Sequence, residues 1–214
     1  MVIVFDLDDT LYDEIDFVKS GFREVSRYLG KNEYYDFMYD IFLKEGSGKI
    51  FNRLIEKFSL DVSLQKLIEI YRFHKPQIKL PKDSLRVLRF TKKYKTALIS
   101  DGHYIMQQNK FNALNLEKFI EYPIFTDFYH TKKPKLKPFK IVMEKYINEK
   151  NFVYISDNPK KDFFAPNELG WKTIRYKNPN GIYKHIENNA HYEVENKEEI
   201  IEILTKLNKM YNSR

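Results

Sequence analysis

The sequence predicts an α/β fold: a Rossmann-like parallel β-sheet core that carries an inserted, all-helical cap domain. Three observations lead to this prediction. A short apolar run opens the chain, residues 12–80 contain only helical patterns, and strand and helix patterns alternate after Pro81. Alternation of this kind is typical of a mostly parallel sheet covered by helices.

The opening run, Val2 to Phe5, consists of β-branched and aromatic residues without a polar position. Such a run suits a strand that is buried on both faces, as parallel strands are. Because no basic leader precedes it and the run is short, we interpret it as a first strand and not as a signal peptide.

After Tyr12, apolar residues recur at steps of three and four, which is the spacing of one face of an α-helix. The first of these helices is expected to end at Gly30, because glycine commonly ends a helix. Three further helical patterns follow before Leu80, and a flexible stretch, Gly46 to Gly48, separates two of them. We therefore predict a cap at residues 13–80 and an α/β core formed by residues 1–12 and 81–214.

The second part of the core alternates between the two kinds of pattern. We expect helices at 83–93, 103–114, 137–147 and 197–208 and a short one before Gly170, with strands at 96–100, 122–125, 152–156, 172–176 and 192–194.

The composition excludes some kinds of partner and some kinds of chemistry. The net charge is +7, but the lysines are spread along the chain and alternate with acids, so we expect no nucleic-acid partner. No run approaches the roughly 20 apolar residues of a membrane helix, so no membrane association is expected. The absence of cysteine excludes disulfides and thiolate chemistry and favours a reducing compartment. We expect a cytoplasmic protein, and its oligomeric state stays open.

Three of the predicted strands end in polar residues or lead directly into them. In a parallel sheet the ligand crevice lies outside the carboxyl ends of the strands, so these residues are expected to meet there. They are Asp6-Leu7-Asp8-Asp9-Thr10, Ser100-Asp101-Gly102 and Ser156-Asp157-Asn158 with the later Asp162, and Lys133 lies between the second and third groups.

This set of side chains suits one phosphate group and one metal ion. A phosphate ester is anionic and repels a nucleophile, so a carboxylate attacks it only when cations offset the charge. Magnesium prefers oxygen ligands, and a lysine supplies a further positive charge. Backbone amides and a hydroxyl bind the remaining oxygens, and a second carboxylic acid transfers the proton.

The four groups, in this order, resemble the motifs of the haloacid dehalogenase superfamily of phosphohydrolases, and the helical insertion lies where that family carries its type-one cap. By this resemblance Asp6 is the nucleophile and Asp8 the general acid/base. The Leu7 amide lies near the phosphate, the Asp8 carbonyl binds Mg²⁺, and Thr10 supports the motif.

The resemblance also assigns the later motifs. Ser100 holds the phosphoryl group with the Asp101 and Gly102 amides, and Lys133 is the catalytic lysine. Asp157 is expected to be a direct magnesium ligand together with Asp6. The remaining acid, Asp162, is expected to act through water or by holding Lys133. Ser156 stands where the family commonly has glycine, a small departure.

The resulting expectation is a magnesium-dependent phosphatase that hydrolyses a small phosphorylated metabolite through an aspartyl-phosphate intermediate. The stretch Leu11 to Glu14 resembles members that handle sugar or polyol phosphates, with nucleoside monophosphates close behind. A phosphosugar mutase of the same superfamily and an inactive binding module also stay open. Two further residues have open roles: His103 faces the site or packs, and Lys49 contacts substrate or belongs to a plain helix connection.

Overall fold

The computed structural model describes residues 1–187 and 189–213. Within this part of the chain, six parallel strands form one sheet in the order β3-β2-β1-β4-β5-β6. Their bounds are β1 Val2–Phe5, β2 Lys95–Ser100, β3 Tyr122–Phe125, β4 Phe152–Ser156, β5 Lys172–Tyr176 and β6 Tyr192–Val194. The expected parallel α/β sheet is therefore confirmed.

Strand β1 lies in the middle of the sheet, between β2 and β4. Phe5, its last residue, is opposite Leu98 on one side and Ile155 on the other. The three strands therefore end close to the same level, with Ser100 and Ser156 as the last residues of β2 and β4. This register brings the polar groups that follow the strands to one edge of the sheet.

Helices cover both faces of the sheet. Successive side chains of β1 pack in two different hydrophobic clusters, because successive side chains of a strand point to opposite faces of the sheet. Ile3 packs in a cluster with Leu88 and Leu204, and Val4 packs in a second cluster with Phe139. The helices are α5 Lys82–Thr91, α6 Tyr104–Ala113, α7 Lys137–Lys145, α8 Phe164–Glu168 and α9 Lys197–Asn212, with 3₁₀ turns at Leu116–Lys118 and Thr126–Tyr129.

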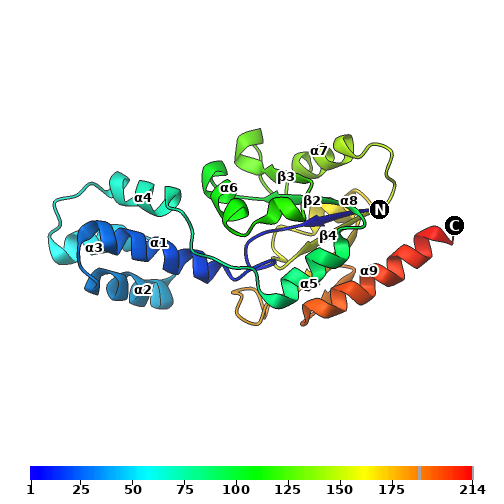
Figure 1. Ribbon diagram of the computed structural model, residues 1–214. Coiled ribbons are helices and arrows are strands. Elements are labelled where there is room, and N and C mark those ends of the chain that lie inside the picture. Colours follow the sequence, from blue (N-terminus) through cyan, green and yellow to red (C-terminus); the bar gives the residue numbers. More distant parts are fainter. Residues whose placement is uncertain (188, 214) are drawn as a thin grey trace.

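Four of the helices between β1 and β2 form a lobe beside the sheet (Figure 1). They are α1 Glu14–Leu29, α2 Glu33–Glu45, α3 Ile50–Phe58 and α4 Leu64–Phe73, and we refer to them as the cap helices. They pack around a separate hydrophobic core that includes Val25, Met38, Leu54 and Leu67. The domain boundaries at residues 13 and 80 stay a prediction.

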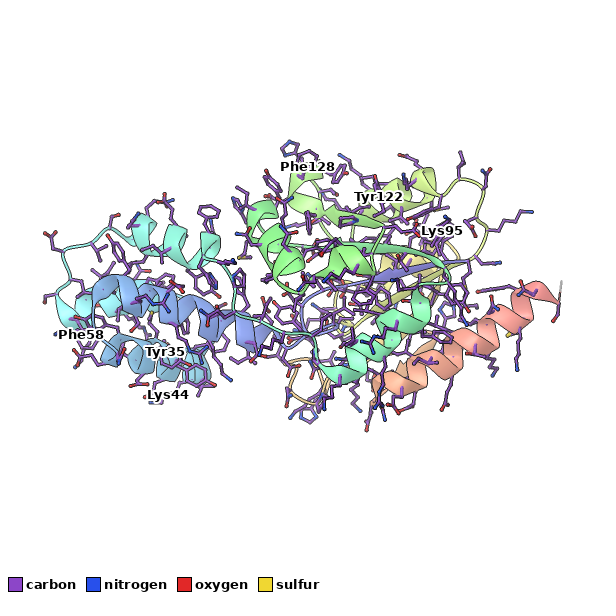
Figure 2. All side chains as sticks on the ribbon, in the orientation of Figure 1. Tyr35, Lys44, Phe58, Lys95, Tyr122 and Phe128 are labelled. Carbon is purple, nitrogen blue, oxygen red and sulfur yellow. The ribbon has the colours of Figure 1, made fainter. Side chains whose placement is uncertain are left out.

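The cap helices carry many aromatic side chains, and Figure 2 shows Tyr35 and Phe58 among them, with Tyr122 and Phe128 on the α/β body. The two parts also touch each other. At the carboxyl end of α4, the centre of the Phe73 ring lies 5.2 Å from that of the His103 ring, just before α6. The lobe is thereby in contact with the segment that follows Ser100.

Most predicted elements occur at the expected positions, with differences at helix ends. Helix α9 continues to Asn212 instead of ending at residue 208, because Tyr211 still packs against the core. Helix α7 ends at Lys145, two residues early, and Ile147 beyond it is 80% exposed.

Candidate active site

Asp6 is the first residue after β1, and its backbone N–H donates to the Ile155 carbonyl at 2.9 Å. This bond extends the sheet by one residue and fixes the direction of the side chain. Asp6 Oδ1 accepts a hydrogen bond of 2.7 Å from Lys133 Nζ. Burial raises the pKa of Asp6 to about 6, although the Lys133 ammonium acts in the opposite direction. The structure thus places a buried carboxylate directly against a fixed cation.

Lys133 is held by more than this one contact. Its Nζ lies 2.9 Å from Asp162 Oδ1 and donates to Tyr154 Oη at 3.0 Å. Burial alone would lower the pKa of Lys133, but Asp162 and Asp6 outweigh it and hold that pKa well above its ordinary value. The ammonium therefore stays charged.

The three acids Asp6, Asp157 and Asp162 each bring a carboxylate oxygen within 4.8 Å of the others. Burial, followed by the charges of Asp6 and Asp162, raises the pKa of Asp157 to about 9. The positive charge near these buried acids is not enough to stabilise all of them in the ionised form. Their carboxylate oxygens are hard donors, which are the ligands that Mg²⁺ prefers. Thr10 Oγ1 lies 3.5 Å from Asp157 Oδ1 and orients this acid. The donor set fits a divalent cation.

Ser156, at the end of β4, contributes to the same cluster. Its hydroxyl donates to Asp162 Oδ2 and lies 3.4 Å from Asp6 Oδ2. A glycine here could make neither contact, so the serine at this position adds a hydroxyl that orients Asp162.

Asp8 is surrounded by donors. Its Oδ1 accepts from Lys110 Nζ at 2.8 Å and from Tyr12 Oη at 2.6 Å, and its Oδ2 accepts from Gln107 Nε2 at 2.7 Å. Burial acts to raise the pKa of Asp8, but the Lys110 charge and these hydrogen bonds outweigh it, so that the pKa is lowered. The arrangement favours the carboxylate form.

The residues after β2 meet the same groups. Gln107 Nε2 also lies 2.8 Å from Ser100 Oγ and 2.6 Å from the Asp101 carbonyl oxygen. The Asp101 carboxylate accepts from the Lys133 backbone N–H at 3.1 Å and from Lys161 Nζ at 2.8 Å. This side chain therefore ties the β2 end to the segment that carries Lys133.

Two residues, Gly102 and Leu7, are expected to bind the phosphoryl group through their backbone amides. Gly102 has a φ of +123°, a conformation that favours glycine, and a Cβ there would lie 3.3 Å from the Gln107 side chain. Leu7 is fully buried, and its side chain packs in the same core as Ile3. The assignment of their amides to a phosphoryl group stays a prediction.

A cavity of about 170 Å³ lies over these groups. It is lined by Asp6, Asp8, Asp9, Glu14, Asp101, Asp157, Asn158, Lys161, Ile182 and Tyr183. A larger hollow of about 380 Å³ lies on the cap helices near Arg23 and Asp36. The buried acids and the paired lysine mark the smaller cavity as the candidate site, so we refer to it as the catalytic crevice.

Sequence reasoning missed several residues around the crevice. Gln107 and Lys110 lie three positions apart on α6, and both are fully buried. Their spacing would place them on one helix face, but a lysine is ordinarily expected at the surface. Lys161, between Asp157 and Asp162, and Glu14, the first residue of α1, also line the crevice. None of the four was predicted as a site residue from the sequence.

Two residues with open roles can be placed. The His103 ring contacts Phe73 and stacks on Tyr104 at 6.3 Å, and His103 is not among the residues that line the crevice. Lys49 precedes α3 and lines a cavity of about 230 Å³ among the cap helices. A contact between Lys49 and a substrate stays a prediction.

The protein has an α/β fold with a helical insertion. Its acid-rich crevice lies at the edge of the parallel sheet and is typical of an enzyme active site. The chain belongs to the haloacid dehalogenase-like hydrolase family, whose model matches residues 3–176. Among residues 1–187 and 189–213, no helix is both long and apolar enough to span a membrane.

Curated relatives match over most of their length. The chain is 28% identical to a glyceraldehyde 3-phosphate phosphatase from Methanocaldococcus jannaschii, covering 97% of this chain and 98% of the relative. It is 27% identical to a phosphoglycolate phosphatase from Aquifex aeolicus, covering 80% and 82% of the two chains.

Solved structures share the fold. A magnesium-bound haloacid dehalogenase (HAD) hydrolase from Bacillus subtilis matches with a TM-score of 0.71 and 16% identity, covering 95% of this chain and 97% of that one. A HAD phosphatase from Thermococcus onnurineus matches with a TM-score of 0.59 and 23% identity, covering 95% and 97% of the two chains.

Proposed function

We propose that this protein is a magnesium-dependent phosphatase that hydrolyses a small phosphorylated metabolite through an aspartyl-phosphate formed on Asp6. The observation that carries the proposal is the 2.7 Å contact between Asp6 Oδ1 and Lys133 Nζ beside a cluster of buried acids. A carboxylate attacks an anionic phosphorus centre only where positive charge is fixed nearby, and this crevice supplies it.

In the first step an Asp6 carboxylate oxygen attacks phosphorus. The new bond is the acyl phosphate, the bond from phosphorus to the ester oxygen breaks, and Asp8 gives a proton to the departing oxygen. Lys133 and the Ser100 hydroxyl hold the phosphoryl oxygens during the transfer.

In the second step water attacks phosphorus, Asp8 accepts its proton, and the bond to Asp6 breaks to release phosphate. The three donors around Asp8 favour the ionised form that this step requires. Proton donation in the first step then depends on the bound substrate, whose negative charge raises the proton affinity of Asp8.

We propose that Asp6 and Asp157 hold Mg²⁺ together with the Asp8 backbone carbonyl, and a carboxylate oxygen of Asp162 lies within 4.8 Å of those of Asp6 and Asp157. When bound, the ion supplies a Lewis acid that offsets the phosphate charge. The three acids are themselves buried, so the ion would also offset their mutual repulsion.

The size of the crevice supports a short substrate. Its volume of about 170 Å³ is below the roughly 300 Å³ at which pockets for drug-sized ligands begin. The relatives named above are a glyceraldehyde 3-phosphate phosphatase and a phosphoglycolate phosphatase. We therefore propose a phosphorylated sugar or hydroxy acid of a few carbon atoms as the substrate.

The test is phosphate release from a panel of esters: glyceraldehyde 3-phosphate, phosphoglycolate, glycerol phosphates, hexose phosphates and nucleoside monophosphates, with Mg²⁺ present. We expect the short esters to give the highest kcat/KM and Asp6→Asn to give no release. A preference for nucleoside monophosphates would contradict the substrate class. No release from any ester would contradict the phosphatase function.

A further inference from the structure

The loop that follows β5, residues 177–187, reaches the catalytic crevice. Ile182 and Tyr183 line the crevice, and their neighbours in its lining are charged or amide side chains. Ile182 is 79% exposed, although a large aliphatic side chain gains free energy by leaving water. The crevice therefore has one apolar wall, and this wall comes from outside the four motifs.

A buried arginine holds this loop in place. Arg175, in β5, is 1% exposed and donates from Nη2 to the Tyr183 carbonyl and from Nη1 to the Ile186 carbonyl, each at 2.6 Å. Its Nε also donates to the Asp157 carbonyl at 3.4 Å. One guanidinium thus connects the backbone of an acid in the crevice to the loop that carries the apolar wall.

A second attachment comes from the first residues of the loop. Asn178 is 4% exposed, and its Nδ2 donates to the Asp9 carbonyl and to Asp13 Oδ1, both at 3.0 Å. Asn180 Nδ2 donates to Asp13 Oδ2 at 3.1 Å. The loop is therefore hydrogen-bonded both to the segment after β1 and to β5. These hydrogen bonds fix the backbone on either side of the exposed Ile182, which lies at the crevice.

We propose that Ile182 and Tyr183 are specificity-determining residues that contact the carbon skeleton of the leaving group, and that Arg175 is the positioning residue that holds them there. The inference rests on the proposed function, because it takes the crevice as the phosphate site. Charged groups can hold the phosphoryl end, whereas the carbon atoms beyond the ester oxygen gain free energy by packing against an apolar surface. The leaving group so selected has an aliphatic backbone of a few carbon atoms.

Binding of two phosphonates separates these roles without requiring turnover. Methylphosphonate has almost no carbon skeleton, and n-propylphosphonate carries three carbon atoms. Isothermal titration with Mg²⁺ should show that Ile182→Ala weakens n-propylphosphonate about 3- to 10-fold, while methylphosphonate changes less than about twofold. Because Ile182 is exposed, its replacement leaves the folded core intact.

Ile147 offers a matched control. It is an isoleucine with 80% exposure in the turn before β4, at the opposite edge of the sheet from the crevice. Ile147→Ala should leave both dissociation constants unchanged. Equal effects of Ile182→Ala and Ile147→Ala on n-propylphosphonate would overturn the proposal.

The positioning role has its own readout. Arg175→Met should weaken n-propylphosphonate more than methylphosphonate, and Arg175→Lys should restore part of the difference. Equal weakening of the two phosphonates would show that Arg175 acts on the phosphate site as a whole, which contradicts a positioning role toward the loop. If Arg175→Met does not fold, the Ile182 and Ile147 pair decides the proposal.

Failure of the phosphatase function and failure of the apolar wall give different results. If the wild type releases no phosphate from any ester, but Ile182→Ala weakens n-propylphosphonate and Ile147→Ala does not, the phosphatase function is refuted and the role of the apolar wall is retained. Wild-type protein that hydrolyses short esters, with no loss of n-propylphosphonate affinity in Ile182→Ala, refutes the wall alone.

Discussion

Lys110 Nζ lies 2.8 Å from Asp8 Oδ1, and the lysine side chain is fully buried. The same ammonium lies 4.3 Å from the centre of the Phe17 ring and 3.6 Å from Glu14 Oε1. Phe17 and Glu14 belong to α1, the first of the cap helices. One buried cation therefore joins the proposed acid/base to the point where the cap begins.

Replacing Lys110 by methionine should lower kcat by about 10-fold or more, because Asp8 loses the cation that fixes its carboxylate. The steady-state kinetics of a short alkyl phosphate provide the measurement. Lys140→Met, on the exposed face of α7, is the control and should match the wild type. A Lys110→Met enzyme with the kinetics of this control would remove Lys110 from the site.

Gly21 allows α1 and α4 to approach closely. A Cβ atom at this position would lie 2.5 Å from Tyr71 Cδ2, and the Tyr71 ring is itself packed against Phe17 and Phe22. Gly21→Ala should therefore lower the free energy of unfolding by about 1–3 kcal/mol through overpacking. Denaturant unfolding is the measurement. Gly48→Ala, where a Cβ would meet nothing within 4 Å, should leave stability nearly unchanged, and equal losses in both variants would contradict the close approach.

His74 joins the end of the last cap helix to α1. Since a carbonyl can only accept, His74 Nδ1–H donates to the Tyr71 carbonyl at 2.7 Å, and Nε2 accepts from the Ser20 hydroxyl at 3.0 Å. Burial lowers the pKa of His74 below its ordinary 6.5, with Lys110 acting the same way and the Tyr71 carbonyl and Glu24 opposing. The neutral ring is thus the form that fits the folded protein.

The sign of the resulting pH dependence follows from the protons bound. Below pH 6.5 the unfolded state binds a proton at His74 more readily than the folded state does. The contribution of neutral His74 to the free energy of unfolding is therefore full above pH 6.5. It is lost as the pH falls from 6.5 toward the lower pKa of the folded state. His74→Gln should remove that part of the dependence. Unfolding titrations on both sides of pH 6.5 test it, and an identical pH profile in the variant would show that His74 does not contribute.

Magnesium should stabilise the protein as well as activate it, because it offsets the repulsion among Asp6, Asp157 and Asp162. We expect added Mg²⁺ to raise the melting temperature of the wild type and excess chelator to abolish phosphate release. In Asp157→Asn the rise should be much smaller, and activation should need more Mg²⁺. Full activity in chelator, or an equal thermal shift in Asp157→Asn, would contradict the proposed ligand set.

The fold was largely predictable from the sequence because its signals are local. The apolar run at Val2 to Phe5, the helical spacing up to Phe73 and the later alternation each reflect a periodicity that tertiary packing does not override. Helix ends were less predictable. Helix α9 extends past residue 208 because Tyr211 packs against the core, and this contact depends on the tertiary structure.

The candidate site was predictable only in part. Residues at or just after the carboxyl ends of strands, such as Ser100 and Asp6, could be grouped because parallel strands end at one edge. Lys110 and Arg175 could not, since each is a cation buried by tertiary packing, and a single sequence gives no sign that a lysine or arginine is paired. The apolar wall at Ile182 depends on the path of a loop, and a loop has no periodicity that would predict its path.

The most direct test of the central claim is to trap the intermediate on Asp6. The enzyme is mixed with a short phosphate ester labelled in its phosphoryl group, quenched in acid during turnover and digested, and the labelled peptide is identified by mass spectrometry. We expect label on Asp6 in the wild type and none in Asp6→Asn. Turnover with no label on Asp6, or label on a different residue, would contradict it.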